Sequence, residues 1–82
     1  MAGEAAGGLV LTPEQEARLE KDFTYHPPKG DQVDRYNAIR ANAEIVAALI
    51  LTSTPASREQ SLALTNLEQA VMWANAAIAR NE

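Results

Sequence analysis

The sequence contains no cysteine and a single histidine, His26. Without cysteine the chain has neither disulfides nor thiolate metal sites, and one histidine cannot build a zinc site without several carboxylate partners. The 82 residues include only one Trp, one Phe and two Tyr, whereas sixteen alanines supply helix propensity but little core volume. A single small domain without disulfides or a metal usually completes its burial with other subunits, so we expect a homo-oligomer.

Basic residues are also scarce, because seven Lys and Arg stand against eleven Asp and Glu for a formal charge of −4. This balance disfavours a protein that follows the backbone of DNA or RNA, yet it permits a small anionic ligand held by a few local cations. No apolar run reaches the roughly 18 residues of a membrane span, and the N-terminus does not resemble a signal peptide. We therefore expect a soluble intracellular protein without a membrane partner.

Sequence signatures of catalysis are absent as well. The chain has no phosphate-binding Walker loop, dinucleotide fingerprint, HExxH zinc motif or nucleophile elbow. Glu44, Glu59 and Glu68 fall on expected helix faces near basic residues, which favours solvated charge over a catalytic pair. The expectation is a protein that is not an enzyme and uses neither a metal nor a cofactor.

The chain up to residue 30 divides into a leader, a short helix and an extended loop. Residues 1–11 are expected to form a flexible leader, since Met1–Gly8 is rich in Gly and Ala without periodicity. Residues 12–82 then form one helical domain. Thr12, Pro13 and Gln15 form a capping-box pattern that predicts a short helix over about residues 13–22. Two prolines keep the following stretch, FTYHPPKG (residues 23–30), extended.

A second helix is expected to begin at an Asp31 cap and to run to about Leu51. Apolar residues recur on it at helical spacing: Val33, Tyr36, Ile39 or Arg40, Ala43, Val46 or Ala47, and Ile50. The segment IVAALIL (residues 45–51) is apolar on all sides. A single partner helix cannot cover all of these side chains, so the segment predicts burial on more than one side.

A third helix should follow the polar connector TSTPA (residues 52–56) and run to about Arg80. Ser57 and Gln60 match a second capping box. A heptad seam lies along this helix, at Leu64, Leu67, Val71, Ala74 and Ile78, beside a line of small residues at Ala63, Ala70 and Ala77 that permits close helix approach. The fold predicted is all-α: a short helix, an extended loop and an antiparallel two-helix hairpin that assembles into a homo-oligomer.

The loop between the first two helices has two interpretations. It is either a plain linker or a ligand-binding loop, because rigid Pro27 would help to present the Tyr25 ring for stacking on a base and the His26 imidazole for hydrogen bonding. Lys29 is either a phosphate contact or a solvated turn residue. Tyr25 could equally anchor a core or an interface.

Three further residues carry a choice of roles. Arg40 lies near the apolar stripe, where it either pairs with Glu44 or meets an anion in an interface. Arg58 lies at a helix N-terminus that attracts phosphate, although a solvated first turn explains it as well. Trp73 is expected in a core or an interface rather than as a stacking platform.

Several stretches together resemble a known phage family: FTYH at residues 23–26, RYNAIR at 35–40, SREQSLALT at 57–65 and EQAVMWANAAIAR at 68–80. The likeness spans about residues 23–82. It is to the anti-CBASS cyclic-nucleotide sponges, which are related to the Thoeris anti-defence sponges.

The resemblance implies a homohexamer that binds cyclic dinucleotides such as cyclic GMP-AMP between protomers, and in some members cyclic trinucleotides at separate sites. The ligand would be sequestered without cleavage in the cytoplasm of the infected bacterial host, which blocks CBASS immunity. Tyr25 matches the family's base-stacking position, and Arg40 best matches a basic residue of the dinucleotide pocket. Arg58 and Arg80 are the basic candidates for the trinucleotide.

Two alternatives remain at this point. One is a Thoeris-type sponge for cyclic ADP-ribose isomers. The other is a helical adaptor that blocks a host protein through the exposed faces of its hairpin.

Overall fold

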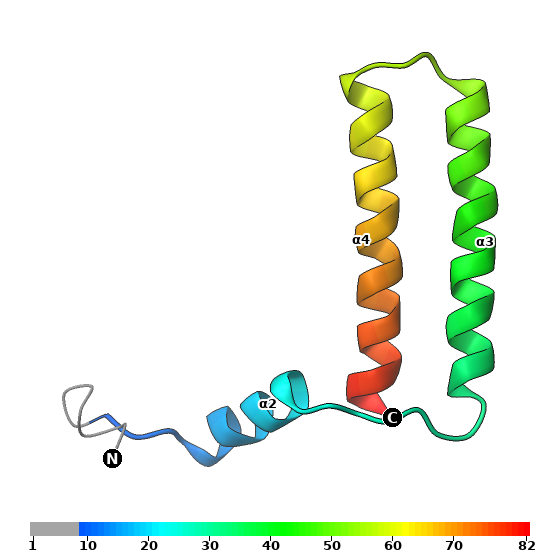
Figure 1. The fold of residues 1–82 in the computed structure, drawn as a ribbon. Coiled ribbons are helices and arrows are strands. Elements are labelled where there is room, and N and C mark those ends of the chain that lie inside the picture. Colours follow the sequence, from blue (N-terminus) through cyan, green and yellow to red (C-terminus); the bar gives the residue numbers. More distant parts are fainter. Residues whose placement is uncertain (1–8) are drawn as a thin grey trace.

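Residues 9–82 are described by a computed structural model, and Met1–Gly8, the larger part of the expected leader over residues 1–11, lies outside them. Within this range the chain forms three helices and no strand: α2 (Pro13–Phe23), α3 (Gln32–Ser53) and α4 (Arg58–Asn81). The last two lie side by side and antiparallel, while α2 projects from the base of this hairpin (Figure 1). The all-helical prediction is confirmed, with each expected helix end within two residues of the observed one. None of these helices is both long and apolar enough to cross a membrane.

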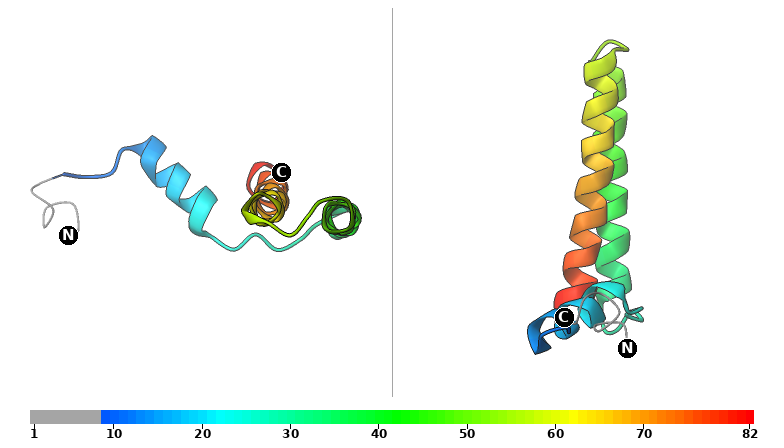
Figure 2. Two further views of the ribbon diagram at one scale, coloured as in Figure 1. Left: turned by 90° about the horizontal axis from the view of Figure 1, so that it is seen from above. Right: turned by 90° about the vertical axis from the view of Figure 1, so that its left-hand side faces the viewer.

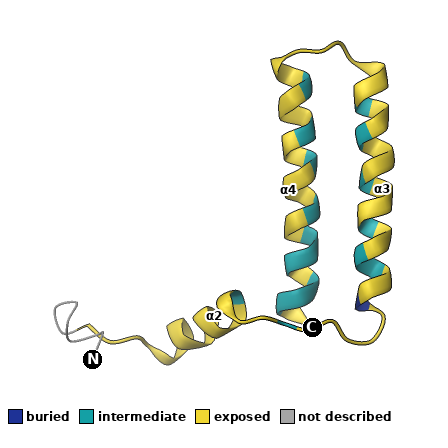
Figure 3. Ribbon diagram, in the orientation of Figure 1, coloured by how far each residue is buried: buried dark blue, intermediate teal, exposed yellow. Residues whose placement is uncertain are grey.

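The start of α2 follows the predicted capping box. The Thr12 hydroxyl accepts a hydrogen bond from the Gln15 amide (3.1 Å), and the Gln15 side-chain oxygen accepts one from the Thr12 amide (3.0 Å). Both partners satisfy backbone donors that the helix itself leaves free. No residue of α2 is buried, so α2 is exposed along nearly its whole length (Figure 3).

α3 begins directly after Asp31, as predicted, but the Asp31 side chain makes no capping hydrogen bond. Its carboxylate instead accepts a hydrogen bond from Arg35 one turn later (3.1 Å). The turn before the helix is closed by Gln32. Its backbone amide donates a hydrogen bond to the Lys29 carbonyl, and its side-chain oxygen accepts one from the Lys29 backbone amide (both 3.1 Å). Gly30 provides the positive φ of 56° that this turn requires.

The tip of the hairpin also differs in detail. α3 continues past Leu51 to Ser53, and Pro55 then prevents its continuation. Ser57 caps α4 as expected, because its hydroxyl accepts from the Gln60 amide (3.1 Å). The reciprocal half of this capping box is wrong: the Gln60 side chain donates to the Thr54 carbonyl instead (3.0 Å) and so closes the tip.

The facing sides of α3 and α4 carry the predicted stripes. Half-buried residues recur at heptad spacing on both helices: Tyr36, Ile39, Ala43, Ala47 and Ile50 on α3, and Leu64, Leu67, Val71, Ala74 and Ile78 on α4. Figure 3 shows the half-buried bands of the two helices facing each other across the hairpin. Of the pairs that the sequence left open, Ile39 rather than Arg40 and Ala47 rather than Val46 therefore belong to the stripe. Val33 is wrongly placed in it, since Val33 is 50% exposed and the preceding Gln32 turns inward.

No apolar residue in the described range is buried, and Gln32 is the single buried residue in it. The radius of gyration is 18.7 Å, whereas a compact domain of this length has about 12 Å. Seen from above, the hairpin is one helix thick, with α2 extending away from it (Figure 2). Ala63, Ala70 and Ala77 are exposed as well, so no helix within this range packs against that line. One chain thus leaves most of its apolar surface in solvent.

Candidate functional site

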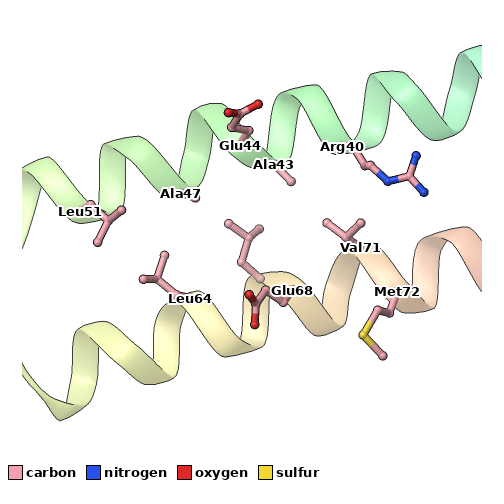
Figure 4. Close-up of a pocket in the computed structure, with 10 residues that line it drawn as sticks. Arg40, Ala43, Glu44, Ala47, Leu51, Leu64, Glu68, Val71 and Met72 are labelled. Carbon is pink, nitrogen blue, oxygen red and sulfur yellow. The ribbon is translucent and has the colours of Figure 1, made fainter.

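A shallow groove runs along one face of the hairpin between α3 and α4 (Figure 4). Its volume is about 730 Å³. The floor consists of seam residues, and charged side chains and a methionine stand at its edges; the lining residues are Arg40, Ala43, Glu44, Ala47, Leu51, Leu64, Leu67, Glu68, Val71 and Met72. The groove combines apolar surface with one guanidinium and two carboxylates.

Arg40 is the basic residue of this groove. Its side chain is exposed and has no ion-pair or hydrogen-bond partner among residues 9–82. The alternative pairing with Glu44 is not formed, and the two side chains leave α3 in different directions (Figure 4). The guanidinium therefore keeps its donors available for an anion.

The loop that carries Tyr25, His26 and Pro27 joins α2 to α3 at the base of the hairpin (Figure 1). Tyr25 is 79% exposed, so it is not an anchor in the core of a single chain. His26 is half-buried, and its Nε2 lies 2.7 Å from the Lys21 carbonyl oxygen. Since a carbonyl only accepts, Nε2 carries the proton and donates. Pro27 is exposed next to it.

A polar cluster, which we call the base cluster, consists of Lys29, Asp31, Gln32, Arg35 and Glu82. The Arg35 guanidinium forms two hydrogen bonds to the Glu82 carboxylate, of 2.8 and 2.6 Å, and thereby connects α3 to the end of α4. Gln32 donates to the same carboxylate (3.0 Å), and Lys29 Nζ donates to the backbone oxygen of Glu82. Lys29 is therefore neither a purely solvated turn residue nor a free ammonium.

This pairing changes the acid–base behaviour of both partners. The hydrogen bond from Arg35, followed by that from Gln32, lowers the pKa of Glu82 to about 2. The bond to Glu82, followed by that to Asp31, raises the pKa of Arg35 above its usual range. Glu82 consequently remains charged at every physiological pH.

The remaining candidates lie at different ends of the hairpin. Arg58 begins α4 at the tip, a whole α3 length of 22 residues, or about 33 Å, from the Tyr25 loop. No ion pair or hydrogen bond engages the Arg58 side chain within the described residues. Arg80 lies at the base, where its Nε is 3.8 Å from an Asp22 oxygen of α2. Trp73 is 65% exposed on α4 and belongs to no core of the single chain.

A single chain therefore does not bring all five predicted site residues together. Tyr25, His26 and Pro27 are adjacent at the base, whereas Arg40 begins the third turn of α3, about 12 Å along its axis from the helix start. Arg58 is at the far end. No group of three or more potential metal ligands occurs within residues 9–82. Contact between Arg58 and the Tyr25 loop requires a second copy of the chain.

Sequence reasoning missed the base cluster. One part of it carried a signal, because Asp31 and Arg35 have the spacing of an ion pair on one helix face. Glu82 carried none, because its partners are about 50 residues away in the sequence and meet it only once the hairpin has closed.

Comparison with known proteins agrees with this architecture. The model of one protein family, described as Acb2/Tad1, hairpin domain, matches residues 15–79. This range covers most of α2, all of α3 and nearly all of α4. No curated protein and no solved structure shows significant similarity to the chain.

The description of the matched model names two related families: Acb2 is the anti-CBASS sponge family and Tad1 is the Thoeris one. Membership implies a small cyclic nucleotide ligand and an oligomeric protein. The chain belongs to the Acb2/Tad1 hairpin-domain family of anti-defence sponges.

Proposed function

We propose that this protein is a phage anti-CBASS sponge that binds cyclic dinucleotides, such as cyclic GMP-AMP, and sequesters them without cleaving them. It acts in the cytoplasm of the infected bacterium, where the CBASS cyclase releases its messenger. The observation that carries the proposal is the state of the two residues matched to the dinucleotide pocket. Tyr25 is an exposed aromatic ring next to a hydrogen-bonded histidine, and Arg40 is a guanidinium without a protein partner among the described residues.

These two residues fit the chemistry of the ligand. A cyclic dinucleotide offers two bases with flat apolar faces and two phosphates. An exposed tyrosine stacks on a base, which contributes about 1–3 kcal/mol, and a guanidinium forms paired hydrogen bonds to a phosphate. A two-fold interface would supply each residue twice, in a symmetry that matches two bases and two phosphates.

The oligomer is part of the proposal, and we propose a homohexamer. Support comes from the absence of any buried apolar residue in the described part of the chain and from exposed apolar side chains on the hairpin, including Ile45, Leu49 and Trp73. Burying a large apolar side chain contributes roughly 1.5–3 kcal/mol, so several of them per subunit can offset the cost of association. The ligand would then lie between subunits.

The matched family model also favours one second candidate, because its description covers the Thoeris sponges. A Thoeris-type sponge would take cyclic ADP-ribose isomers, which present one adenine face and two linked phosphates. The same tyrosine and arginine could serve that ligand. A panel of ligands therefore separates the two candidates more directly than any substitution.

The test is calorimetric titration of the purified protein with cyclic GMP-AMP, other cyclic dinucleotides, cyclic trinucleotides and cyclic ADP-ribose isomers. The proposal expects tight binding of a cyclic dinucleotide and recovery of the intact ligand after heat release. Linear products would identify a phosphodiesterase, and preference for cyclic ADP-ribose isomers would identify the Thoeris-type sponge. Failure of every ligand, together with capture of one stoichiometric host protein, would favour a helical adaptor.

A further inference from the structure

The loop between α2 and α3 places two neighbouring side chains in different environments. Tyr25 is 79% exposed, while His26 is half-buried and bonded to the Lys21 carbonyl. In extended backbone, successive side chains point to opposite sides, so a histidine directed toward the protein directs the preceding tyrosine outward. The orientation of Tyr25 therefore depends on where the His26 ring is held.

The His26 bond also completes the end of α2. The last carbonyls of a helix have no partner within the helix. Here the Thr24 amide donates a hydrogen bond to the Glu20 carbonyl (3.2 Å), and His26 Nε2 donates one to the carbonyl of the next residue, Lys21 (2.7 Å). Since these two bonds are consecutive, the histidine continues the capping of α2 across the loop and ties the residue after Tyr25 back to the last turn of the helix.

The other side of the loop is restrained by different means. Pro27 and Pro28 have fixed φ angles, and each restricts the residue before it to extended backbone. Beyond them, the Lys29 amide and carbonyl are both bonded to Gln32 at the start of α3 (3.1 Å each). Tyr25 thus lies in a short segment that is held at both ends, and on the α2 side the Thr24 amide restrains the residue before it and His26 the residue after it.

From this geometry we infer that His26 is a positioning residue: it holds Tyr25 ready to stack on the ligand and does not itself touch the nucleotide. The inference rests on the proposed function, and it changes the role that the sequence pattern assigned to His26. Nε2 is occupied by the Lys21 carbonyl, which leaves Nδ1 as the free ring nitrogen. Preorganisation of this kind improves affinity because less loop ordering is required on binding.

Substitutions of His26 by glutamine and asparagine distinguish a positioning role from direct contact with the ligand. Glutamine places its NH₂ close to the position of imidazole Nε2, whereas asparagine places it close to Nδ1. His26→Gln should therefore keep the bond to Lys21, and His26→Asn and His26→Ala should lose it. We expect cyclic GMP-AMP affinity close to wild type for H26Q and roughly tenfold weaker for H26N and H26A. If His26 touches the ligand through Nδ1, H26Q should bind as weakly as H26A, which would overturn the inference.

A ligand-free measurement separates this inference from the proposed function. In ¹⁵N-labelled protein of native oligomeric size, we expect the His26 ring signals of an Nε2–H imidazole and a rigid Tyr25 amide; the amide should become mobile in H26A and remain rigid in H26Q. A Tyr25 amide that is equally rigid in H26A would overturn the inference even if the ligand binds. If wild type binds no cyclic nucleotide, the proposed function fails, while these spectra still decide whether His26 holds the loop.

Discussion

The two halves of the hairpin differ in which side chains are paired and which are left exposed. At the base, the cluster of Lys29, Asp31, Gln32, Arg35 and Glu82 joins α3 to α4 through direct hydrogen bonds, and it contains the single buried residue of the described range. In the half toward the tip, large apolar side chains such as Ile45 and Leu49 are more than 60% exposed. The base is therefore organised within one chain, whereas the tip half has surface for other chains to cover.

The proposed sponge needs both a ligand-binding loop and a surface for oligomer formation, and these two features can be assigned to different parts of the hairpin. In the proposed function the Tyr25 loop binds the ligand, and the hydrogen bonds that restrain this loop lie at the base, on both sides of Tyr25. An oligomer needs apolar surface that a single chain leaves open, and the part of it formed by Ile45 and Leu49 lies toward the tip, away from the loop. A substitution in the loop should therefore weaken ligand binding without dispersing the oligomer, whereas a substitution that disperses the oligomer should remove both.

The largest effect is expected from a charge in the exposed apolar surface of the tip half. Leu49→Glu should disperse the oligomer and abolish ligand binding with it, because a carboxylate buried in an apolar interface without a partner costs several kcal/mol. Sedimentation velocity measures the change in mass. The control is Asn37→Glu, which adds the same charge at an exposed polar position of α3. A Leu49→Glu protein of unchanged mass would show that this surface is not an interface.

The next largest effect is expected at the base. Tyr25→Ala should weaken cyclic GMP-AMP binding about a hundredfold or more while the oligomer stays intact, since stacking contributes about 1–3 kcal/mol per base and a two-fold site would lose two stacks. Calorimetric titration measures the affinity. Phe23→Ala is the matched control, because Phe23 is an equally exposed aromatic residue (82%) at the end of α2. Equal losses in the two variants would remove Tyr25 from the site.

Arg40 tests whether the ligand site extends from the base into the groove. Arg40→Ala should weaken dinucleotide binding about 10- to 100-fold, because hydrogen bonds to charged groups contribute roughly 1.5–3 kcal/mol. Arg40→Lys should lose less, since it keeps the charge but not the paired donors. Arg18→Ala removes the same charge from a side chain that is 82% exposed on α2, and it should leave affinity unchanged. A matching loss in Arg18→Ala would indicate a general charge effect instead.

A smaller effect is expected at Gly30, in the turn that leads into α3. Gly30→Ala should destabilise the fold by about 1–2 kcal/mol, because φ is 56° there and a left-handed conformation is unfavourable for alanine. A Cβ atom added at Gly30 has no neighbouring atom within 4 Å, so the loss of stability comes from backbone strain alone. Gly30→Asn should lose less, since asparagine tolerates this conformation better. Thermal unfolding measures both variants, and equal stabilities of alanine and glycine would contradict the turn geometry.

The smallest effect is expected from the exposed Arg35–Glu82 pair. The pKa of Glu82 is lowered from 4.5 to about 2, so the stability that the pair contributes is present above about pH 4.5 and is lost as the pH falls toward 2. Thermal unfolding of wild type and Glu82→Gln should differ slightly at neutral pH and converge in acid. A difference that stays constant down to pH 2 would show that the pairing does not stabilise the hairpin.

The helices could be predicted from the sequence because their signals are local. Thr12 with Gln15 marked the start of α2, and the heptad of Leu64, Leu67 and Val71 marked the face of α4. The position of the start of α3 was also predicted, but the role of the Asp31 side chain was not, because its carboxylate pairs with Arg35 instead of capping the helix. Local patterns do not determine which of two nearby partners a carboxylate takes.

The candidate site was predictable only in part, for a related reason. The loop pattern singled out Tyr25, the apolar stripe singled out Arg40, and the family resemblance matched both to the ligand site; both side chains are exposed in the structure. The bond from His26 to Lys21 was not predictable, since a histidine five residues beyond a carbonyl has no characteristic spacing for that contact. The arrangement of Arg58 relative to the loop depends on other subunits, which no pattern within one chain describes.

Native mass spectrometry with a panel of cyclic nucleotides tests the central claim most directly, because one spectrum reports both the oligomer and its ligands. The account predicts a homohexamer whose mass increases by whole numbers of intact cyclic dinucleotide, and a Tyr25→Ala hexamer that shows no such increase. A monomer, or an oligomer whose mass no nucleotide changes, would contradict it.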